Sequence, residues 1–293
     1  MKIILAEHFG MCFGVRDAIA QAEKLGREAP LTILGELVHN PLVRERLRAR
    51  GVAEGSLDQT RSTSQRVMIT AHGAATGVVE RLRARGLRVE EATCPLVAHA
   101  HRQLQRLVAQ GYFPVVIGHP HHVEVRGLVE DLDEYAVISS EEEVPRLAGR
   151  PRLGVVSQTT QPVEFVRRIV DRFRAAFPEA EVRFVDTVCQ PTKERQSAAR
   201  RLASLCPVVI VIGGRNSNNT RQLVRTCEAE GARAHQVETA ADLRPEWFID
   251  IDTVGLTAGT STPDAVIQEV HDALLRFAEP AKCNLVSLEE NPE

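Results

Sequence analysis

The stretch Glu91-Ala92-Thr93-Cys94-Pro95-Leu96-Val97 joins a strand-like run to a helix-like run, with a cysteine at the junction. Cys12 and Cys189 stand at two further junctions of the same kind. In open α/β sheets, ligands bind at side chains that lie between the carboxyl end of a strand and the next helix. The three cysteines therefore predict a repeated α/β unit that carries its functional groups at the strand ends.

Polar residues repeat with the cysteines. Each cysteine is followed, 27 or 28 residues later, by a polar residue that again ends an apolar run: His39, His122 and Ser217. A third set follows three further apolar runs: His72, Thr159 and Ser261. This periodicity predicts three similar α/β units with mostly parallel sheets, whose strand ends face a common site.

The composition is typical of a globular protein that binds neither nucleic acid nor a membrane. Of the 293 residues, 43% are hydrophobic and 26% are charged. A net charge of -3 gives no electrostatic attraction to DNA, and an aromatic content of 4% argues against a stacking surface for single strands. No apolar run approaches ~18 residues, and residues 1–6 are too short for a secretory core, so we expect a cytoplasmic protein.

Apolar runs predict strands, and apolar residues at helical spacing predict helices. The expected strands are residues 2–7, 31–34, 67–70, 113–117, 153–157, 207–212 and 253–257. The expected helices are residues 15–25, 41–50, 80–88, 96–110, 162–177, 192–205, 219–230 and 263–277. We interpret the Arg-rich segments 43–50 and 80–88 as solvated helix faces.

Helix caps and loops complete this assignment. Asn40 and Thr262 are expected to cap helices whose first residues are Pro41 and Pro263. Residues 54–65 are expected to form a loop, and residues 279–293 to form a disordered polar tail.

Six cysteines in a reducing compartment are expected as ligands, nucleophiles or core residues rather than disulfides. Cys206, Cys227 and Cys283 have local structural explanations. The remaining three lack both a fourth thiolate and the Cys-x-x-Cys knuckle of most zinc sites. Three thiolates can hold a [4Fe-4S] cluster by three irons and leave one iron open to a substrate oxygen. The repeat thus favours a catalytic cluster.

Zinc is the disfavoured interpretation of the segment His119-Pro120-His121-His122, because no helical His-x-x-x-His pair is present. The polar residues near the cysteines suit an anion instead. Glycine- and amide-rich turns at residues 213–220 and 257–264 open helices and present backbone donors, which suits a phosphate. Glu124 is the one carboxylate in this set.

Nine segments, in this order, resemble the 4-hydroxy-3-methylbut-2-enyl diphosphate reductases. They are residues 10–14, 35–41, 71–73, 92–97, 119–127, 157–160, 186–196, 216–220 and 257–264, which together span nearly the whole chain. The resemblance implies a pseudo-threefold cloverleaf of three α/β units around a central [4Fe-4S] cluster. It also implies reductive removal of a hydroxyl to give isopentenyl and dimethylallyl diphosphate, the last step of the non-mevalonate isoprenoid pathway.

Carried over to this sequence, the family's motifs imply roles for single residues. The cluster ligands would be Cys12, Cys94 and Cys189. Glu124 would deliver the proton, and Thr159 would orient the substrate alcohol or relay a proton. The diphosphate would be bound by a polar set: His39, His72, His122, Ser217, Asn218, Asn219 and Ser261.

The resemblance also implies unit boundaries and partners. The units would be residues 14–96, 97–190 and 191–280, with a strand in residues 1–13 packing on the third unit and residues 281–293 as a polar tail. The partners would be the allylic diphosphate substrate and an external electron donor such as ferredoxin or flavodoxin, with no nucleic acid and no membrane.

Several residues that border the site differ from those usual in the family: Ala74, Ala75, Val123, Gln190, Pro191 and Asn218. None of these differences removes a ligand. They leave open the alternative that the protein is a paralogue that acts on another allylic diphosphate. Two further functions stay open from the residues alone. One is a cluster-free phosphate-binding module or transferase with the cysteines in its core, and the other is a redox or iron sensor without turnover.

Overall fold

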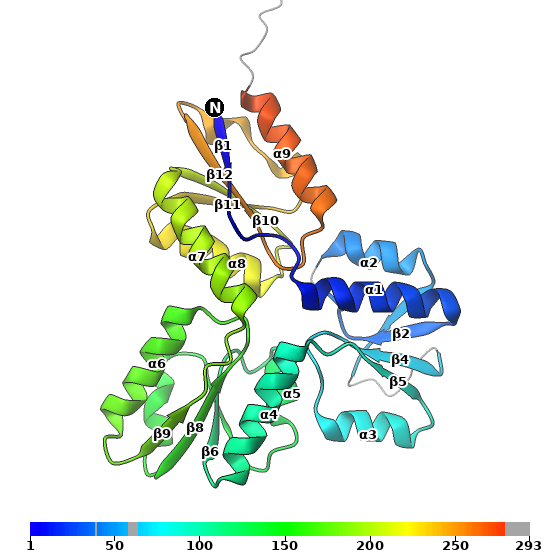
Figure 1. Ribbon diagram of the computed structural model, residues 1–293, viewed down its shortest axis with the longest axis vertical. Helices are drawn as coiled ribbons and strands as arrows, with labels where there is room; N and C mark the ends of the chain where they lie inside the picture. Colours follow the sequence, from blue (N-terminus) through cyan, green and yellow to red (C-terminus); the bar gives the residue numbers. More distant parts are fainter. Residues whose placement is uncertain (39, 58–63, 279–293) are drawn as a thin grey trace, which may run out of the picture.

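The computed structural model describes residues 1–38, 40–57 and 64–278. Within these residues the chain forms three four-stranded parallel sheets, each with its own helices, arranged as three lobes around a centre (Figure 1). The predicted α/β class with three similar units is confirmed. The predicted unit boundaries and the tail stay predictions, and residues 279–293 lie outside the described residues.

The first sheet has the order β3-β2-β4-β5. Its strands are β2 (Leu31–Leu34), β3 (Val52–Gly55), β4 (Arg66–Ile69) and β5 (Arg88–Glu91). The helices of this lobe are α1 (Phe13–Glu28), α2 (Pro41–Arg48) and α3 (Thr76–Ala84). Helix α1 buries one stripe against the sheet because its small and apolar residues recur at helical spacing, among them Ala18, Ala22 and Leu25.

The second sheet has the order β7-β6-β8-β9. Its strands are β6 (Phe113–Ile117), β7 (Ala136–Ile138), β8 (Arg152–Ser157) and β9 (Glu181–Phe184). The helices are α4 (Pro95–Ala109), α5 (Val123–Val129), α6 (Val163–Ala176) and the short 3₁₀ helix η1 (Glu141–Leu147). Phe173 of α6 is fully buried in the core of this lobe.

The third sheet has the order β1-β12-β10-β11 and takes its first strand from the amino-terminal end of the chain. Its strands are β1 (Lys2–Leu5), β10 (Val208–Ile212), β11 (Arg233–Val237) and β12 (Thr253–Ala258). The helices are α7 (Gln190–Leu205), α8 (Asn218–Ala229), α9 (Asp264–Ala278) and the 3₁₀ helices η2 (Ala240–Asp242) and η3 (Pro245–Phe248). The register pairs Lys2 with Thr253 and Leu5 with Leu256, in parallel.

The three sheets share one topology. In each, the second strand along the lobe lies beside the first, the third lies on the other side of the first, and a fourth strand forms the far edge. Strand β1 takes this fourth position in the third sheet. From the first strand of each sheet, the chain therefore crosses over to one side and then to the other. The topological switch points lie between β2 and β4, between β6 and β8, and between β10 and β12. Open parallel sheets bind their ligands at such switch points.

Burial explains which strands the sequence predicts well. The middle strands β2, β6, β8, β10 and β12 are buried along most of their length, as their apolar runs indicate. Several edge strands have a mixed pattern and carry no such run: β3, β5, β7, β9 and β11. Of these, β3 occupies the start of the predicted loop 54–65, so that part of the prediction is wrong. Residues 58–63 lie outside the described residues.

Two helix predictions also need correction. Helix α3 ends at Ala84, and Arg88 opens strand β5, so the predicted helix 80–88 is wrong at its carboxyl end. Asn40 caps α2 as expected, since its side chain accepts a hydrogen bond from the Val43 backbone N–H. Thr262 does not cap α9, because α9 begins two residues later, at Asp264; the Thr262 hydroxyl donates to the Ile212 carbonyl.

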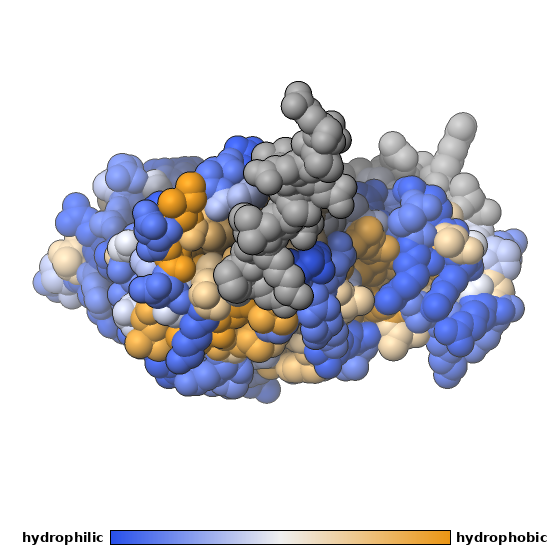
Figure 2. Space-filling model, turned by 90° about the horizontal axis from the view of Figure 1, so that it is seen from above, coloured by the Kyte–Doolittle hydropathy of each residue, from blue (hydrophilic) through white to orange (hydrophobic). Residues whose placement is uncertain are grey.

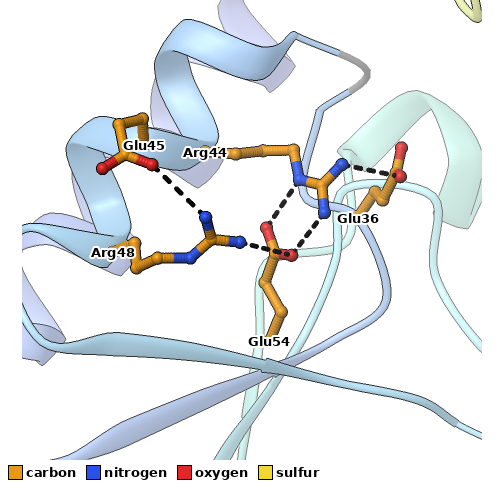
Figure 3. Close-up of polar contacts among 5 residues, drawn as sticks. All are labelled: Glu36, Arg44, Glu45, Arg48 and Glu54. Atoms are coloured by element: carbon orange, nitrogen blue, oxygen red, sulfur yellow. Dashed lines mark hydrogen bonds and ion pairs between the residues drawn. The ribbon is translucent and has the colours of Figure 1, made fainter.

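The Arg-rich face of α2 is less solvated than we expected. The Arg44 guanidinium donates to both carboxylate oxygens of Glu54, at 2.8 and 2.6 Å, and to Glu36 at 3.0 Å (Figure 3). Arg48 lies 3.3 Å from Glu45 and 3.8 Å from Glu54. The bidentate pair joins α2 to the edge strand β3 and so fixes the start of α2 beside the first sheet.

The surface at the amino-terminal end of the third sheet includes apolar patches among mostly hydrophilic residues (Figure 2). Exposed large apolar side chains of this lobe include Ile249, Leu275 and Phe277. No helix in the part of the chain that the structure describes combines the length and the apolar character needed to cross a bilayer.

Candidate active site

Each of the three predicted ligand cysteines occupies the position just before a helix. Cys12 precedes α1, Cys94 precedes α4 and Cys189 precedes α7. The starts of these three helices meet near the centre of the cloverleaf (Figure 1). The three thiols therefore sit at helix amino termini, where the macrodipole favours negative charge.

Cys12 acts electrostatically on both of the other cysteines. An ideal Cβ at Gly14, in the first turn of α1, would lie only 2.6 Å from the Sγ of Cys94, so only glycine admits this approach. Burial raises the pKa of the Cys94 thiol, the backbone amides of Leu96 and Val97 lower it, and the nearby Cys12 charge raises it further. The structure thus brings together thiols that lie far apart in the sequence.

The Cys189 thiol has a strongly raised pKa. Burial raises its pKa to about 11, although hydrogen bonds with Thr192 act in the opposite direction, and the charges of Glu124 and Cys12 raise it. The Cys189 Sγ lies 3.0 Å from the Thr192 hydroxyl. Without a cation, burial in this centre favours the neutral thiol.

The donor set fits a cluster better than a single metal ion. In the described part of the chain, no group of three His, Cys, Asp or Glu side chains is close enough to hold one ion. One ion with bonds of ~2.3 Å to sulfur needs its thiolates nearly in contact. A cluster places each thiolate on a different iron and therefore needs wider spacing. Three thiols at the starts of three helices, with Gly14 leaving room for the Cys94 sulfur, are a donor set that a cluster could use.

Glu124 and Thr159 form a buried pair beside the cysteines. Glu124 is 1% exposed, and its carboxylate accepts hydrogen bonds from the Thr159 backbone N–H at 2.6 Å and from the Thr159 hydroxyl at 3.0 Å. Burial raises the pKa of Glu124 to about 7, against the lowering effect of both hydrogen bonds. The carboxyl group is therefore poised to exchange a proton near neutral pH.

A cavity of about 60 Å³ lies where all three lobes meet. Its volume is several times the ~15 Å³ that one water-sized group needs. Its polar lining comes from strand ends of every sheet: His72, His122, Thr160, Ser217, Asn218, Asn219, Thr260 and Ser261. Six predicted substrate-binding residues are thus brought together. The seventh, His39, lies outside the described residues.

The cavity is prepared for an anion. Asn218 Nδ2 and Ser261 Oγ are buried and have no hydrogen-bond partner. Asn219 uses its Oδ1 to accept from the Thr260 N–H at 3.1 Å, which leaves its amide nitrogen as a donor. None of the described residues that line the cavity is acidic. Buried donors without an acceptor cost about 1–3 kcal/mol each, a cost that a bound anion would remove.

Two histidines close one side of the cavity. The rings of His72 and His122 meet edge to face, with centroids 5.5 Å apart. His122 caps α5, and its Nδ1 accepts from the Glu124 backbone N–H at 3.2 Å. This hydrogen bond links the cavity wall directly to the residue that carries the perturbed carboxyl group.

A similar backbone hydrogen bond recurs in the three loops that carry the cysteines. The Cys94 N–H donates to the Ala71 carbonyl, the Cys189 N–H donates to the Thr159 carbonyl, and the Gly10 N–H donates to the Ala258 carbonyl. In each sheet, the loop after the fourth strand is therefore tied to the loop after the third. The three cysteines do not line the cavity themselves, but Cys94 is hydrogen-bonded to the lining residue Ala71 and Cys189 is hydrogen-bonded to Thr159, which precedes the lining residue Thr160.

The sequence reasoning missed some residues of this centre. Thr160 and Thr260 line the cavity, and each adjoins a residue that had been chosen. Thr192 and Arg195 lie one and two turns after Cys189, and both are buried. Their spacing from the cysteine was the available signal.

The remaining cysteines behave as predicted where the structure describes them. Cys206 is 1% exposed and Cys227 is 0% exposed, and both pack in the core of the third lobe. Burial raises the pKa of Cys227 to about 12. Cys283 lies outside the described residues.

Comparison with known proteins gives one consistent family. A model of the family described as LytB protein matches residues 3–275. A protein of Aquifex aeolicus named 4-hydroxy-3-methylbut-2-enyl diphosphate reductase is 36% identical over 285 residues, which cover 95% of this chain and 98% of that protein. One of the same name from Pelobacter propionicus is 38% identical over 273 residues, with 92% and 96% covered.

Solved structures agree with the sequence relatives. A structure of (E)-4-hydroxy-3-methyl-but-2-enyl diphosphate reductase, titled the terminal enzyme of the non-mevalonate pathway, is 36% identical, with a TM-score of 0.69 over 94% of this chain and 100% of that chain. The E-1-hydroxy-2-methyl-but-2-enyl-4-diphosphate reductase of Plasmodium falciparum is 25% identical, with a TM-score of 0.86 over 96% of this chain and 89% of that one.

Proposed function

The chain belongs to the LytB protein family, and on that premise we propose that it reduces 4-hydroxy-3-methylbut-2-enyl diphosphate. The reaction takes two electrons and two protons, breaks the allylic C–O bond, and releases water with isopentenyl and dimethylallyl diphosphate. The observation that carries the proposal is the acid-free cavity with two unpaired buried polar groups, Asn218 Nδ2 and Ser261 Oγ, beside a buried carboxyl group.

In this proposal Cys12, Cys94 and Cys189 hold a [4Fe-4S] cluster. When bound, the cluster supplies electrons and one open coordination position. The protein's own contribution is to place three thiols at helix starts, where backbone amides such as those of Leu96 and Val97 stabilise negative charge on sulfur.

The diphosphate is bound by the cavity donors. Ser217 caps α8, and its Oγ accepts from the Thr220 N–H at 3.3 Å, so its own proton is directed elsewhere. The start of α8 adds backbone donors and a favourable dipole. Ser261 and the two histidines complete a ring of donors. These donors bind the diphosphate, which does not react. The binding energy of the diphosphate can therefore position the alcohol.

Glu124 and Thr159 move the proton. When Glu124 is protonated, its hydroxyl can donate to Thr159 Oγ1, and the Thr159 hydroxyl can then turn its own proton toward the substrate alcohol. The 3.0 Å separation of Thr159 Oγ1 and Glu124 Oε2 permits this exchange of donor and acceptor. Protonating the departing hydroxyl makes water the leaving group. Electrons would come from an external donor such as ferredoxin or flavodoxin.

The test begins with anaerobic purification or reconstitution, followed by visible and Mössbauer spectra. The reduced protein is then assayed with the hydroxylated allylic diphosphate, and the two products are quantified. We expect a cluster of the [4Fe-4S] type and turnover to both products. A colourless protein that still binds diphosphate would indicate a cluster-free binding module. A cluster without turnover would indicate a sensor, and turnover only with another allylic diphosphate would indicate a paralogue.

A further inference from the structure

Arg195 connects two of the loops that carry the cysteines. It lies on α7, six residues after Cys189, and is 6% exposed. Its Nη2 and Nε donate to the Gly10 carbonyl at 2.7 and 3.1 Å, and its Nη1 donates to the Pro191 carbonyl at 3.0 Å. Gly10 is two residues before Cys12 and has φ +71°, a left-handed conformation that favours glycine.

The Arg195 guanidinium is a buried cation without a carboxylate partner. All three of its hydrogen bonds go to backbone carbonyls, and among the described residues no Asp or Glu side chain forms an ion pair with it. An arginine stays charged in a protein, because the delocalised guanidinium keeps its proton throughout the physiological pH range. A buried charge that meets only neutral groups costs several kcal/mol. Arg195 also lines a cavity of about 300 Å³ together with Glu7, Cys12 and Glu194, so groups that can carry negative charge lie near it.

Two of the cysteines and a carboxylate act on the guanidinium. Burial lowers the pKa of Arg195, whereas Cys12 and Cys189, followed by Glu194, raise it. Arg16 acts in the same direction as burial. Negative charge on a metal group bound by the two sulfurs would therefore act directly on the guanidinium, in addition to the charge of Glu194.

We propose that Arg195 is a positioning residue that fixes the Cys12 loop against the helix after Cys189 and supplies the positive charge that balances an anionic iron-sulfur group. This inference rests on the proposed cluster. It assigns to Arg195 two separable effects. The fork of donors holds the Gly10 carbonyl, and the charge stabilises the more negative, reduced state of the bound group.

The charge is tested with Arg195→Gln, which keeps a donor for the Gly10 carbonyl and removes the cation. The midpoint potential of the bound cluster is measured by redox titration with optical detection. We expect the ratio of reduced to oxidised protein, at the wild-type midpoint potential, to fall about tenfold, which corresponds to 59 mV for a one-electron couple. A structural role alone would not shift this ratio.

Arg195→Lys separates the two effects, since a lysine keeps the charge but lacks the planar fork. Its potential should stay close to wild type. In the cluster-free protein, the Gly10 N–H, which donates to the Ala258 carbonyl at 3.0 Å, should exchange its hydrogen faster. Arg201→Gln is the matched control, because Arg201 is on the same helix but is 55% exposed, in a pair with Glu7. It should change neither quantity.

Different outcomes would contradict the proposed cofactor, the role of the Arg195 charge, or the positioning role of Arg195. A wild-type protein that binds no cluster would contradict the proposed cofactor, irrespective of Arg195. A wild-type protein with a cluster, together with an unchanged potential in Arg195→Gln, would overturn only the charge inference. An equal shift in the Lys and Gln variants would overturn it as well. If neither variant retains iron, unchanged Gly10 exchange in the cluster-free Lys variant would overturn the positioning role, and faster exchange would support it.

Discussion

Replacing Glu124 by Gln should stabilise the cluster-free protein at neutral and alkaline pH. Burial raises the pKa of this carboxyl group from its ordinary value of 4.5 to about 7. At 1.36 kcal/mol per pKa unit, this rise represents about 3 kcal/mol of unfavourable free energy for the ionised form in the folded state. The Gln amide fits the same place, because its oxygen can accept from the Thr159 N–H and its nitrogen can donate to the Thr159 hydroxyl.

The sign of the pH dependence follows from proton binding. Between pH 4.5 and 7 the folded state holds a proton on Glu124 that the unfolded state has lost, so the free energy of unfolding falls as pH rises through this window. Above pH 7 both states are ionised and the penalty is constant. Gln does not titrate, so the stability difference between Glu124→Gln and wild type should grow by about 2.5 kcal/mol from pH 5 to pH 8.

Urea unfolding of reduced, cluster-free protein at several pH values measures this difference. Subtracting the wild-type curve removes the contributions of other titrating groups, which the two proteins share. Glu130→Gln provides the control, because Glu130 is exposed at the carboxyl end of the same helix, and its curve should run parallel to wild type. A stability difference for Glu124→Gln that stays constant from pH 5 to pH 8 would refute the reasoning. In the loaded enzyme, the same variant should bind substrate and turn it over ~10²-fold more slowly, since a positioned proton donor is gone.

Three further predictions concern the metal, the substrate and the scaffold. Cys189→Ser should lose the bound cluster, as iron and sulfide analysis after anaerobic reconstitution would reveal, and full iron content would remove Cys189 from the ligand set. Ser261→Ala should raise KM by about 3- to 10-fold with little change in kcat, because the variant loses one neutral hydrogen-bond donor that contributes ~1 kcal/mol to substrate binding. A change confined to kcat would contradict a binding role. Arg44→Gln should destabilise the first lobe by about 1 kcal/mol at pH 7, allowing for partial exposure of the Arg44–Glu54 pair. Its hydrogen bond lowers the pKa of Glu54, so the loss should shrink as pH falls below about 4, and a pH-independent loss would contradict the pair's role.

The parts of the fold that the sequence predicts are those where burial is complete. Strands β6 and β10 are buried on both faces, so their apolar runs locate them to within a residue. Strands β9 and β11 are partly exposed and have no apolar run, and β9 alternates polar and apolar residues over only four positions. Such strands form because they pair with a neighbouring strand of the sheet, and their local residue pattern does not reveal this pairing. The sequence alone therefore does not predict them.

The same distinction holds at the site. The polar residues of the cavity were predictable because a threefold repeat places them after strand ends. Pairings across the chain have no local signature. The Thr159–Glu124 hydrogen bonds join residues 35 positions apart, and the Arg195–Gly10 bonds join residues 185 apart. The lack of a partner at Ser261 Oγ is likewise a property of the packed centre, not of the sequence.

The position of the cysteines in the topology gives them a second role. Cys12 lies between β1 of the third sheet and α1 of the first lobe, Cys94 lies between β5 of the first sheet and α4 of the second lobe, and Cys189 lies between β9 of the second sheet and α7 of the third lobe. Each proposed ligand is thus the point at which the chain crosses from one lobe to the next. A group bound by all three thiols would therefore join all three lobes at their crossovers. The cavity takes its walls from all three lobes, so the bound group would hold the substrate donors in place as well as reduce the substrate.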